Sequence, residues 1–166
     1  MGLLIAIILV VLTAPFFIVR KIKTMVDFRN MVEPLEDIAV SYGYKRGIIT
    51  SQIALETNYG KSIIDKNLFN IKATGSWLSS GKFVERKTWE IIKGVRVDVI
   101  AKFRKYDSYE ESLKDYITLI SSLSRYAYAW SQRDNEMEYF KGLVQGGYAT
   151  DLVYAEKLEV MFGKIV

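Results

Sequence analysis

Glu56 is the acidic residue whose position best suits proton-transfer chemistry in this sequence. In a helix it continues the line of Ile48 and Gln52, spaced four residues apart, with Ile49 and Ile53 beside it. It also lies near the expected helix end, where the helix dipole disfavours a negative charge. Apolar surroundings and the dipole both raise a carboxyl pKa. The pattern predicts a carboxyl still protonated near neutral pH, as a general acid for glycoside cleavage requires. The alternative is a carboxylate that reaches solvent.

Glycoside cleavage usually needs a second carboxylate, to activate water or to stabilise the positive charge that develops on the sugar. The candidates in the loop and hairpin regions are Asp65, Glu85, Glu90 and Asp98. Asp98 alternates with valines and is expected on the solvated face of a strand. Glu90 could project over the edge of a cleft, although glutamates of hairpins are usually only solvated.

The aromatic residues suit sugar stacking, because pyranose faces dock on aromatic rings. The chain has 11 tyrosines and 3 tryptophans. Most such residues belong to cores or amphipathic surfaces. Trp77, in a predicted loop, is a better stacking candidate than Trp130.

The composition excludes several kinds of chemistry. The sequence has no cysteine and no histidine, which removes thiol catalysis, Ser-His nucleophiles and zinc sites built on these ligands. No metal or other cofactor is expected. The net charge of +4 owes +3 to Arg20, Lys21 and Lys23, so the rest of the chain does not favour binding of nucleic acid.

The N-terminal segment is predicted to be a membrane anchor. Leu3–Val19 is almost entirely apolar and ends at Arg20. As a helix it would span roughly 25 Å, slightly less than a hydrocarbon core of about 30 Å. A cleaved signal peptide is the alternative, but a basic start and a small-x-small cleavage site are both missing. We therefore expect residues 1–24 to be an anchor with a basic flank and residues 25–166 to be one folded domain.

The orientation of this anchor is left open by the sequence. Its basic residues lie only on the C-terminal flank, which by the positive-inside rule would place the folded domain in the cytoplasm. This placement would not be required of a phage protein that is carried in a virion membrane or released late in infection.

The rest of the sequence predicts a mostly helical α+β domain with one inserted hairpin. Asp27–Val32 is expected to be a linker or first turn, and Ser62–Gly81 a loop. Alternation in Val95–Val99 and the pair Lys93–Gly94 predict a hairpin with Thr88–Ile92. Helices are expected from Pro34 to Tyr42, from about Arg46 to Asn58, after the capping box Ser108-x-x-Glu111, over Asn135–Gln145 and over Asp151–Phe162.

Several short motifs resemble glycoside hydrolase family 73, in the order that this family has them. Ile53-Ala-Leu-Glu-Thr-Asn-Tyr-Gly-Lys-Ser62 is similar to its A-x-E-[ST]-x-[WY]-G-x-S signature, and Asn67-Leu-Phe-Asn-Ile-Lys72 to its N-L-F-G-I-K motif. The others are Thr88-x-Glu90, Phe103-Arg-x-Tyr106-x-Ser108, Glu111-Ser112 through Asp115-Tyr116, Arg125-Tyr126, Gly147-Tyr148-Ala-Thr-Asp151, Tyr154-Ala155 and Lys157-Leu158. The resemblance runs from about Gly47 to Phe162.

The resemblance implies an N-acetylglucosaminidase with a lysozyme-like fold, acting on peptidoglycan glycan strands as bacterial autolysins, flagellar rod proteins and phage lysins do. It implies Glu56 as general acid, Glu90 as base or stabiliser, and Tyr148 near the reacting centre. If Glu90 stays distant, the acetamido group of the substrate could attack instead. Positions that line the saccharide groove map onto Asn67, Phe69 and Tyr126, and Trp77 remains a stacking candidate.

This chain departs from the family pattern at Asn70 and Ala73, which stand where glycines are usual. The alternatives are a muramidase or lytic transglycosylase on the same fold, and a membrane-anchored wall-binding protein without activity. We expect a monomer without a nucleic-acid partner, tethered to a membrane by its N-terminal helix with the catalytic domain facing the cell wall.

Overall fold

The computed structural model describes residues 24–92 and 95–166, with only the backbone described at 89–92. The chain divides into two compact units with the boundary after Pro34. The predicted anchor Leu3–Val19 lies outside the described residues. None of the described helices is long and apolar enough to cross a bilayer. The division between residues 24 and 25 stays a prediction.

In the first unit, residues 24–34 are helical. The prediction of a linker or first turn at Asp27–Val32 was therefore wrong. This stretch has no glycine or proline before Pro34, and Phe28 and Val32, one helical turn apart, are both buried. Helical spacing of apolar residues was predicted only from Pro34 onward, but it begins earlier.

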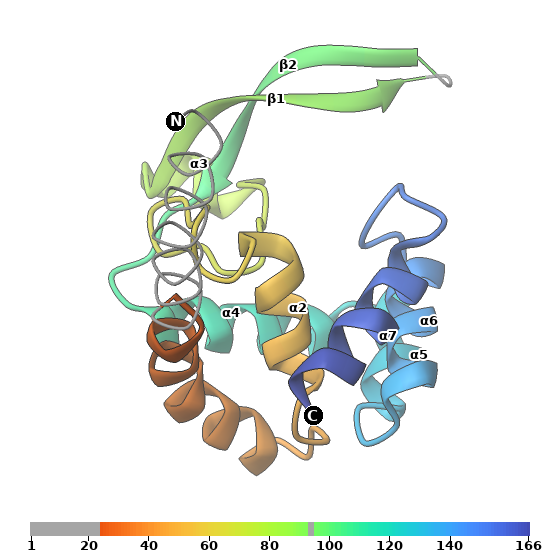
Figure 1. Ribbon diagram of the computed structural model, residues 1–166. Helices are drawn as coiled ribbons and strands as arrows, with labels where there is room; N and C mark the ends of the chain where they lie inside the picture. Colours follow the sequence, from red (N-terminus) through yellow and green to blue (C-terminus); the bar gives the residue numbers. More distant parts are fainter. Residues whose placement is uncertain (1–23, 93–94) are drawn as a thin grey trace, which may run out of the picture. The chain divides into compact units, whose positions relative to one another are not determined.

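The second unit, residues 35–166, is mostly helical with one two-stranded antiparallel sheet, as predicted (Figure 1). Residues 35–41 are helical. The other elements are α2 (Ile48–Thr57), α3 (Ser76–Ser80), β1 (Phe83–Ile92), β2 (Val95–Arg104), α4 (Tyr109–Ser122), the 3-10 turn η1 (Ser124–Tyr126), α5 (Ala127–Ser131), α6 (Glu136–Gln145) and α7 (Tyr154–Ile165).

Helix α2 is the central element of this unit. Eight of its ten residues are buried, so the predicted apolar stripe is in fact a helix covered on nearly every side. It packs against α7, and α7 packs on α6. A helix buried in this way carries its C-terminal end, with Glu56, into the interior of the unit.

The N-terminus of α2 is capped by a side chain that lies outside the helix and earlier in the sequence. Gly47 supplies no side chain for a cap. The carboxylate of Glu36, which is 4% exposed, accepts a hydrogen bond from the backbone N–H of Gly47 at 2.6 Å and from that of Thr50 at 3.3 Å. It also accepts from the hydroxyl of Thr50. Two N–H groups that the helix leaves unpaired are thereby satisfied, and an anion lies at the positive end of the dipole.

The hairpin pairs Phe83 with Arg104 at its base and Ile92 with Val95 at its far end. The predicted turn Lys93–Gly94 lies outside the described residues. Val95 is 63% exposed and Ile100 66%, whereas Ala101 and Phe103 are buried. Among the hairpin side chains that the structure describes, those that belong to the core lie at its base. Figure 1 shows the strands extending away from the helices of this unit.

Two predicted helix starts are confirmed by their caps. The side chain of Ser108 accepts a hydrogen bond from the backbone N–H of Glu111 at 3.0 Å and begins α4. The side chain of Asn135 accepts from the N–H of Glu138 and begins α6. Sequence patterns did not predict η1 or α5, and the prediction of a loop over Ser62–Gly81 missed the five-residue helix α3. These elements are too short for a period to be visible.

Candidate active site

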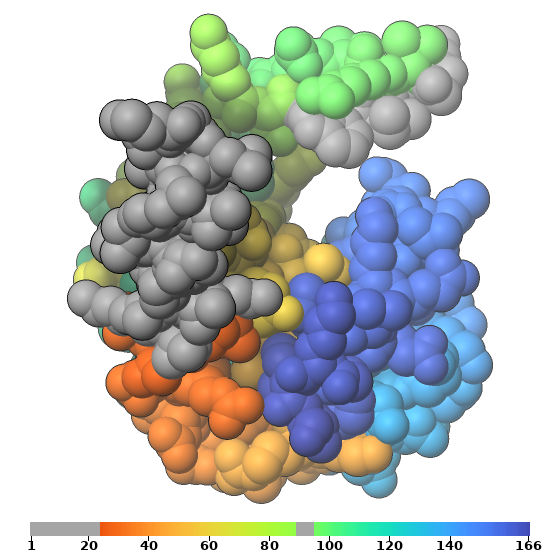
Figure 2. Space-filling model, viewed as in Figure 1, coloured from red at the N-terminus to blue at the C-terminus, as the bar shows by residue number. Residues whose placement is uncertain are grey.

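A cleft of about 770 Å³ lies at the C-terminal end of α2. Its walls come from the loop of residues 62–74, the Arg86–Thr88 part of β1, the end of β2, the end of α4 with η1, and residues 147–154. Figure 2 shows this side hollowed between the hairpin and the C-terminal helices. Segments far apart in sequence therefore meet around the one carboxyl group that the described lining contains, that of Glu56.

Glu56 is half-buried, and both of its carboxyl oxygens accept hydrogen bonds. The hydroxyl of Tyr154 donates to Oε1 at 2.6 Å, and the amide of Asn70 donates to Oε2 at 2.9 Å. Burial raises the pKa of Glu56, and the bonds from Tyr154 and Asn70 lower it by less, so the pKa remains above its usual range. This is the direction that the sequence pattern predicts.

A hydrogen-bonded network of buried polar side chains extends from the hydroxyl of Tyr154. The amide nitrogen of Gln52 donates to the hydroxyl oxygen of Tyr154 at 3.3 Å, and Tyr116 donates to the amide oxygen of Gln52 at 2.5 Å. Tyr116 and Tyr139 share a further hydrogen bond of 2.5 Å. All of these groups are neutral when their protons are in place, and burial raises the pKa of each of these tyrosines well above 10. The network fixes Glu56 without supplying a countercharge.

Asn70 holds Glu56 from the opposite side. Its φ is +50°, in the left-handed region that Asn tolerates better than most residues. Its side-chain amide donates both to Oε2 of Glu56 and to the backbone oxygen of Glu56, the latter at 3.0 Å. Asn70 therefore adopts the turn at which the family usually has glycine, and its side chain contacts the predicted acid Glu56.

Tyr148 lies in the cleft lining close to this carboxyl. Its hydroxyl donates to the backbone oxygen of Phe69 at 2.7 Å, and its ring stacks on Tyr154 with centroids 5.9 Å apart. Burial is the largest cause that raises the pKa of Tyr148 far above 10. The residue is therefore a neutral phenol beside Glu56 whose oxygen can still accept a hydrogen bond from a substrate.

The predicted saccharide-binding residues divide into two pairs. Phe69 and Tyr126 line the cleft, although they are only 1% and 2% exposed. Asn67 and Trp77 are not part of the lining. Asn67 is fully buried, and its side chain bonds the backbone of Ile71 and the backbone oxygen of Arg104. It shapes the loop, and its burial leaves no surface for direct contact with a sugar.

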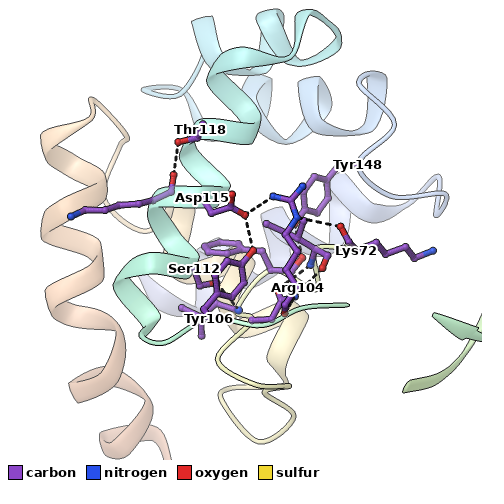
Figure 3. A network of polar contacts seen from close by, with 12 residues as sticks. Lys72, Arg104, Tyr106, Ser112, Asp115, Thr118 and Tyr148 are labelled. Atoms are coloured by element: carbon purple, nitrogen blue, oxygen red, sulfur yellow. Dashed lines mark hydrogen bonds and ion pairs between the residues drawn. The ribbon is translucent and has the colours of Figure 1, made fainter. Parts of the chain in front are cut away.

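Trp77 belongs to a cluster at the base of the hairpin. The guanidinium of Arg104 lies 5.0 Å from its ring centroid, and the ring of Tyr106 packs edge-on against it at 5.3 Å. Figure 3 shows that Arg104 and Tyr106 converge on the carboxylate of Asp115, at 2.6 Å and 2.7 Å. This ion pair is only slightly exposed. It ties β2 to α4, and both elements contribute residues to the cleft lining.

The second carboxylate is not identified by the structure. The backbone of Glu90 pairs with Val97 on β2, but its side chain lies outside the described residues. Asp65 pairs with Arg86 at 3.4 Å, and Glu85 lies 3.6 Å from Lys102. Neither of these carboxylates lines the cleft.

Sequence reasoning did not single out Tyr154 or Asn70 as functional. In the sequence, Tyr154 lies within a family motif and Asn70 departs from one, and neither pattern indicates a contact with Glu56. Their common signal is contact with Glu56 across 98 and 14 residues of sequence, which a single sequence does not reveal. No group of three or more Asp or Glu residues able to hold a metal ion occurs in the described part of the chain.

The second unit is a helical domain with a two-stranded hairpin, and the described lining of its cleft holds one half-buried, hydrogen-bonded carboxyl of raised pKa. These are the features of a lysozyme-like glycoside hydrolase. Residues 32–165 match the family described as glucosaminidase, mannosyl-glycoprotein endo-beta-N-acetylglucosaminidase. The chain belongs to this glucosaminidase family, as its motifs indicated.

Relatives of known structure and curated relatives agree with this assignment. The peptidoglycan hydrolase FlgJ of Vibrio parahaemolyticus is 34% identical over 139 residues, covering 80% of this chain and 44% of its own length. The exo-glucosaminidase LytG of Bacillus subtilis is 34% identical over 70% of this chain and 43% of its own length. The chain thus spans less than half of these relatives. A crystal structure of a peptidoglycan hydrolase mutant from Sphingomonas sp. A1 is 37% identical, with a TM-score of 0.75 over 82% of this chain and 91% of that one.

Proposed function

We propose that the chain hydrolyses peptidoglycan at the β-1,4 bond between N-acetylglucosamine and N-acetylmuramic acid, with Glu56 as general acid. The observation that carries the proposal is the Glu56 carboxyl, which lines the cleft, has a raised pKa and is fixed by Tyr154 and Asn70. The named relatives, two peptidoglycan hydrolases and an exo-glucosaminidase, support the choice of substrate.

In the proposed reaction, the protonated carboxyl of Glu56 gives its proton to the glycosidic oxygen as the bond to the anomeric carbon breaks. The positive charge that develops on the sugar is met by water or by the acetamido oxygen of the substrate. Tyr154 and Asn70 donate to the carboxylate that remains, and so stabilise it once the proton has left. Glu90 is the proposed activator of water, and Tyr148 the proposed positioning group.

Replacement of Glu56 tests the proposal. The full-length chain, kept in detergent, would be incubated with purified sacculi and the reducing ends counted. Glu56→Gln is expected to lower the rate by a factor of at least about 100, the lower range for loss of general acid catalysis. Glu85→Gln, at an exposed carboxylate outside the lining, is the matched control. A wild-type rate from Glu56→Gln would refute the assignment.

Mass spectrometry of the released ends separates the related activities. N-acetylglucosamine reducing ends are expected. Muramic acid ends would instead indicate a muramidase, and anhydro-muramic ends a transglycosylase. Binding to sacculi without any release would indicate a wall-binding protein that has lost activity.

We further propose that residues 1–24 anchor the chain in a membrane and that residues 25–166 form the glucosaminidase domain, facing the wall as a monomer. The apolar run Leu3–Val19 and the basic residues that follow support the anchor. Protease accessibility of the full-length chain in sealed vesicles tests which side the domain occupies.

A further inference from the structure

The charged residues around the cleft are nearly all cationic. The described lining includes five lysines and arginines, namely Lys72, Arg86, Lys87, Arg104 and Arg125. Its one carboxyl group is that of Glu56, whose raised pKa favours the neutral form. The whole chain has only four more basic than acidic residues, so positive charge is concentrated at this site.

Two of these cations have structural partners. Arg104 is paired with Asp115 at 2.6 Å, and Arg86 lies 3.4 Å from Asp65. Among the described residues, no carboxylate lies within 4 Å of the charged end of Lys87 or of Arg125. Both side chains are exposed, and the guanidinium of Arg125 lies over the Tyr126 ring at 4.7 Å. These two residues come from different elements, β1 and η1, and are available to an anionic ligand.

The glycan backbone offers little for such cations. N-acetylglucosamine is uncharged, and its hydroxyl and acetamido groups need donors and acceptors, not a net positive field. Carboxylates occur on N-acetylmuramic acid, either as the lactyl group itself or on the peptide attached to that group. A cationic lining is therefore complementary to the muramyl substituents of the strand.

We propose that Lys87 and Arg125 bind carboxylates of the muramyl substituents and so make the cleft selective for muramic-acid-containing glycan over neutral N-acetylglucosamine polymers. This inference rests on the proposed function, because it assigns the charged part of the same substrate. The two residues are specificity-determining groups, and the cleavage chemistry stays with Glu56.

Three ligands separate the sources of the carboxylate. They are soluble glycan strands that carry peptides, the same strands after an amidase has removed the peptides and left the lactyl carboxylate, and oligomers of N-acetylglucosamine. Binding would be measured on the full-length chain in detergent with Glu56→Gln present, so that the strands stay intact.

Lys87→Gln with Arg125→Gln is expected to weaken binding of the anionic strands by about tenfold at low salt, the order expected for two partly exposed ion pairs. The loss should largely vanish near 1 M salt, where the Debye length is about 3 Å. Binding of the neutral oligomers should be unchanged or undetectable. Loss only with peptide-bearing strands would identify the peptide carboxylates, and loss only with the amidase-treated strands would identify the lactyl carboxylate. Loss with both would show that the two residues bind either kind of carboxylate.

Lys164→Gln is the control for loss of charge away from the cleft, and it is compared with each single variant, Lys87→Gln and Arg125→Gln, since each of the three removes one positive charge. Lys164 lies ten residues beyond Tyr154 on α7, or roughly 15 Å along the helix axis. Equal weakening by Lys164→Gln, or equal loss with the neutral oligomers, would overturn the proposal. Because cleavage by the unmodified chain is measured separately, a chain that cuts sacculi but binds all three ligands alike refutes only this inference. Absence of cleavage refutes the proposed function.

Discussion

Replacement of Asn70 should move the pH range over which the chain is active, because its side chain bonds to the carboxyl of Glu56. The Asn70 amide donates to the Glu56 carboxyl at 2.9 Å and so favours its ionised form. Both Asn70→Gly and Asn70→Ala remove this bond, so the pKa of Glu56 should rise in each. Because the general acid works while protonated, the alkaline limb of the pH–rate profile is expected to move to higher pH by the same amount in both variants.

The two variants differ in backbone strain. At φ +50° glycine is unstrained, whereas alanine costs about 1 kcal/mol relative to glycine. Loss of the side-chain bonds costs about 1–2 kcal/mol in either case. Asn70→Gly should therefore be about 1–2 kcal/mol less stable than the parent chain and Asn70→Ala about 2–3 kcal/mol less. The difference of about 1 kcal/mol separates their melting temperatures by roughly 2–4 °C.

The assay is release of reducing ends from sacculi between pH 4 and 9, with urea denaturation of the same samples. An alkaline limb that moves to lower pH, or that moves only in the less stable variant, would refute the reasoning. It would mean that the Asn70 bond does not act on the ionisation of Glu56.

Three further predictions concern the parts that hold the site in place. The stability of Glu56→Gln relative to the parent should increase as pH rises. The raised pKa of Glu56 stabilises the folded parent below the pKa of the unfolded state, about 4.3, and this stabilisation is lost as pH rises through the folded-state pKa. A stability difference that is independent of pH in urea titrations would contradict this. Glu36→Ala should lose about 2–4 kcal/mol in urea denaturation, because it leaves two N–H groups of α2 unpaired, and a loss below about 0.5 kcal/mol would be incompatible with the cap. In Gly146→Ala the new methyl would meet the Tyr126 ring and lie 2.8 Å from the Arg125 oxygen, so kcat/KM should fall several-fold with a loss of about 1–3 kcal/mol. Gly163→Ala, with open space around it, should cost nothing, and equal effects in the two alanine variants would refute the packing argument.

Much of the fold could be predicted because its signals are local. The Ser108 and Asn135 caps need only three residues of context, and both helices begin where predicted. The apolar face of α4 is likewise buried at Leu113, Tyr116 and Ile120. Leu123 follows Ile120 at helical spacing, but α4 ends at Ser122, and Leu123 is 38% exposed and lines the cleft.

Part of the candidate site could be predicted because some residues carry a local signal. Glu56 follows Ile48 and Gln52 at four-residue spacing and lies within a family motif, although its helix is buried on nearly every side and has no single apolar face. Tyr154 acts through a hydroxyl that reaches Glu56 across 98 residues, and only the tertiary structure brings the two together. Trp77 was predicted in a loop, but it lies in the short helix α3, and its ring already contacts Arg104 and Tyr106, which the sequence does not reveal.

The distribution of charge explains how the site can combine an anionic substrate with an uncharged acid. An arginine beside Glu56 would favour its carboxylate and lower its pKa, but the hydrogen bonds to Glu56 come from a phenol and an amide. The cations stand elsewhere in the lining, and the inward network from Gln52 to Tyr139 contains no charged group. Replacing Gln52 with Glu would place a second carboxyl in this network, and any negative charge that it carries should raise the pKa of Glu56 further. A Gln52→Glu chain whose alkaline limb moved to lower pH would show that the network does not govern the acid.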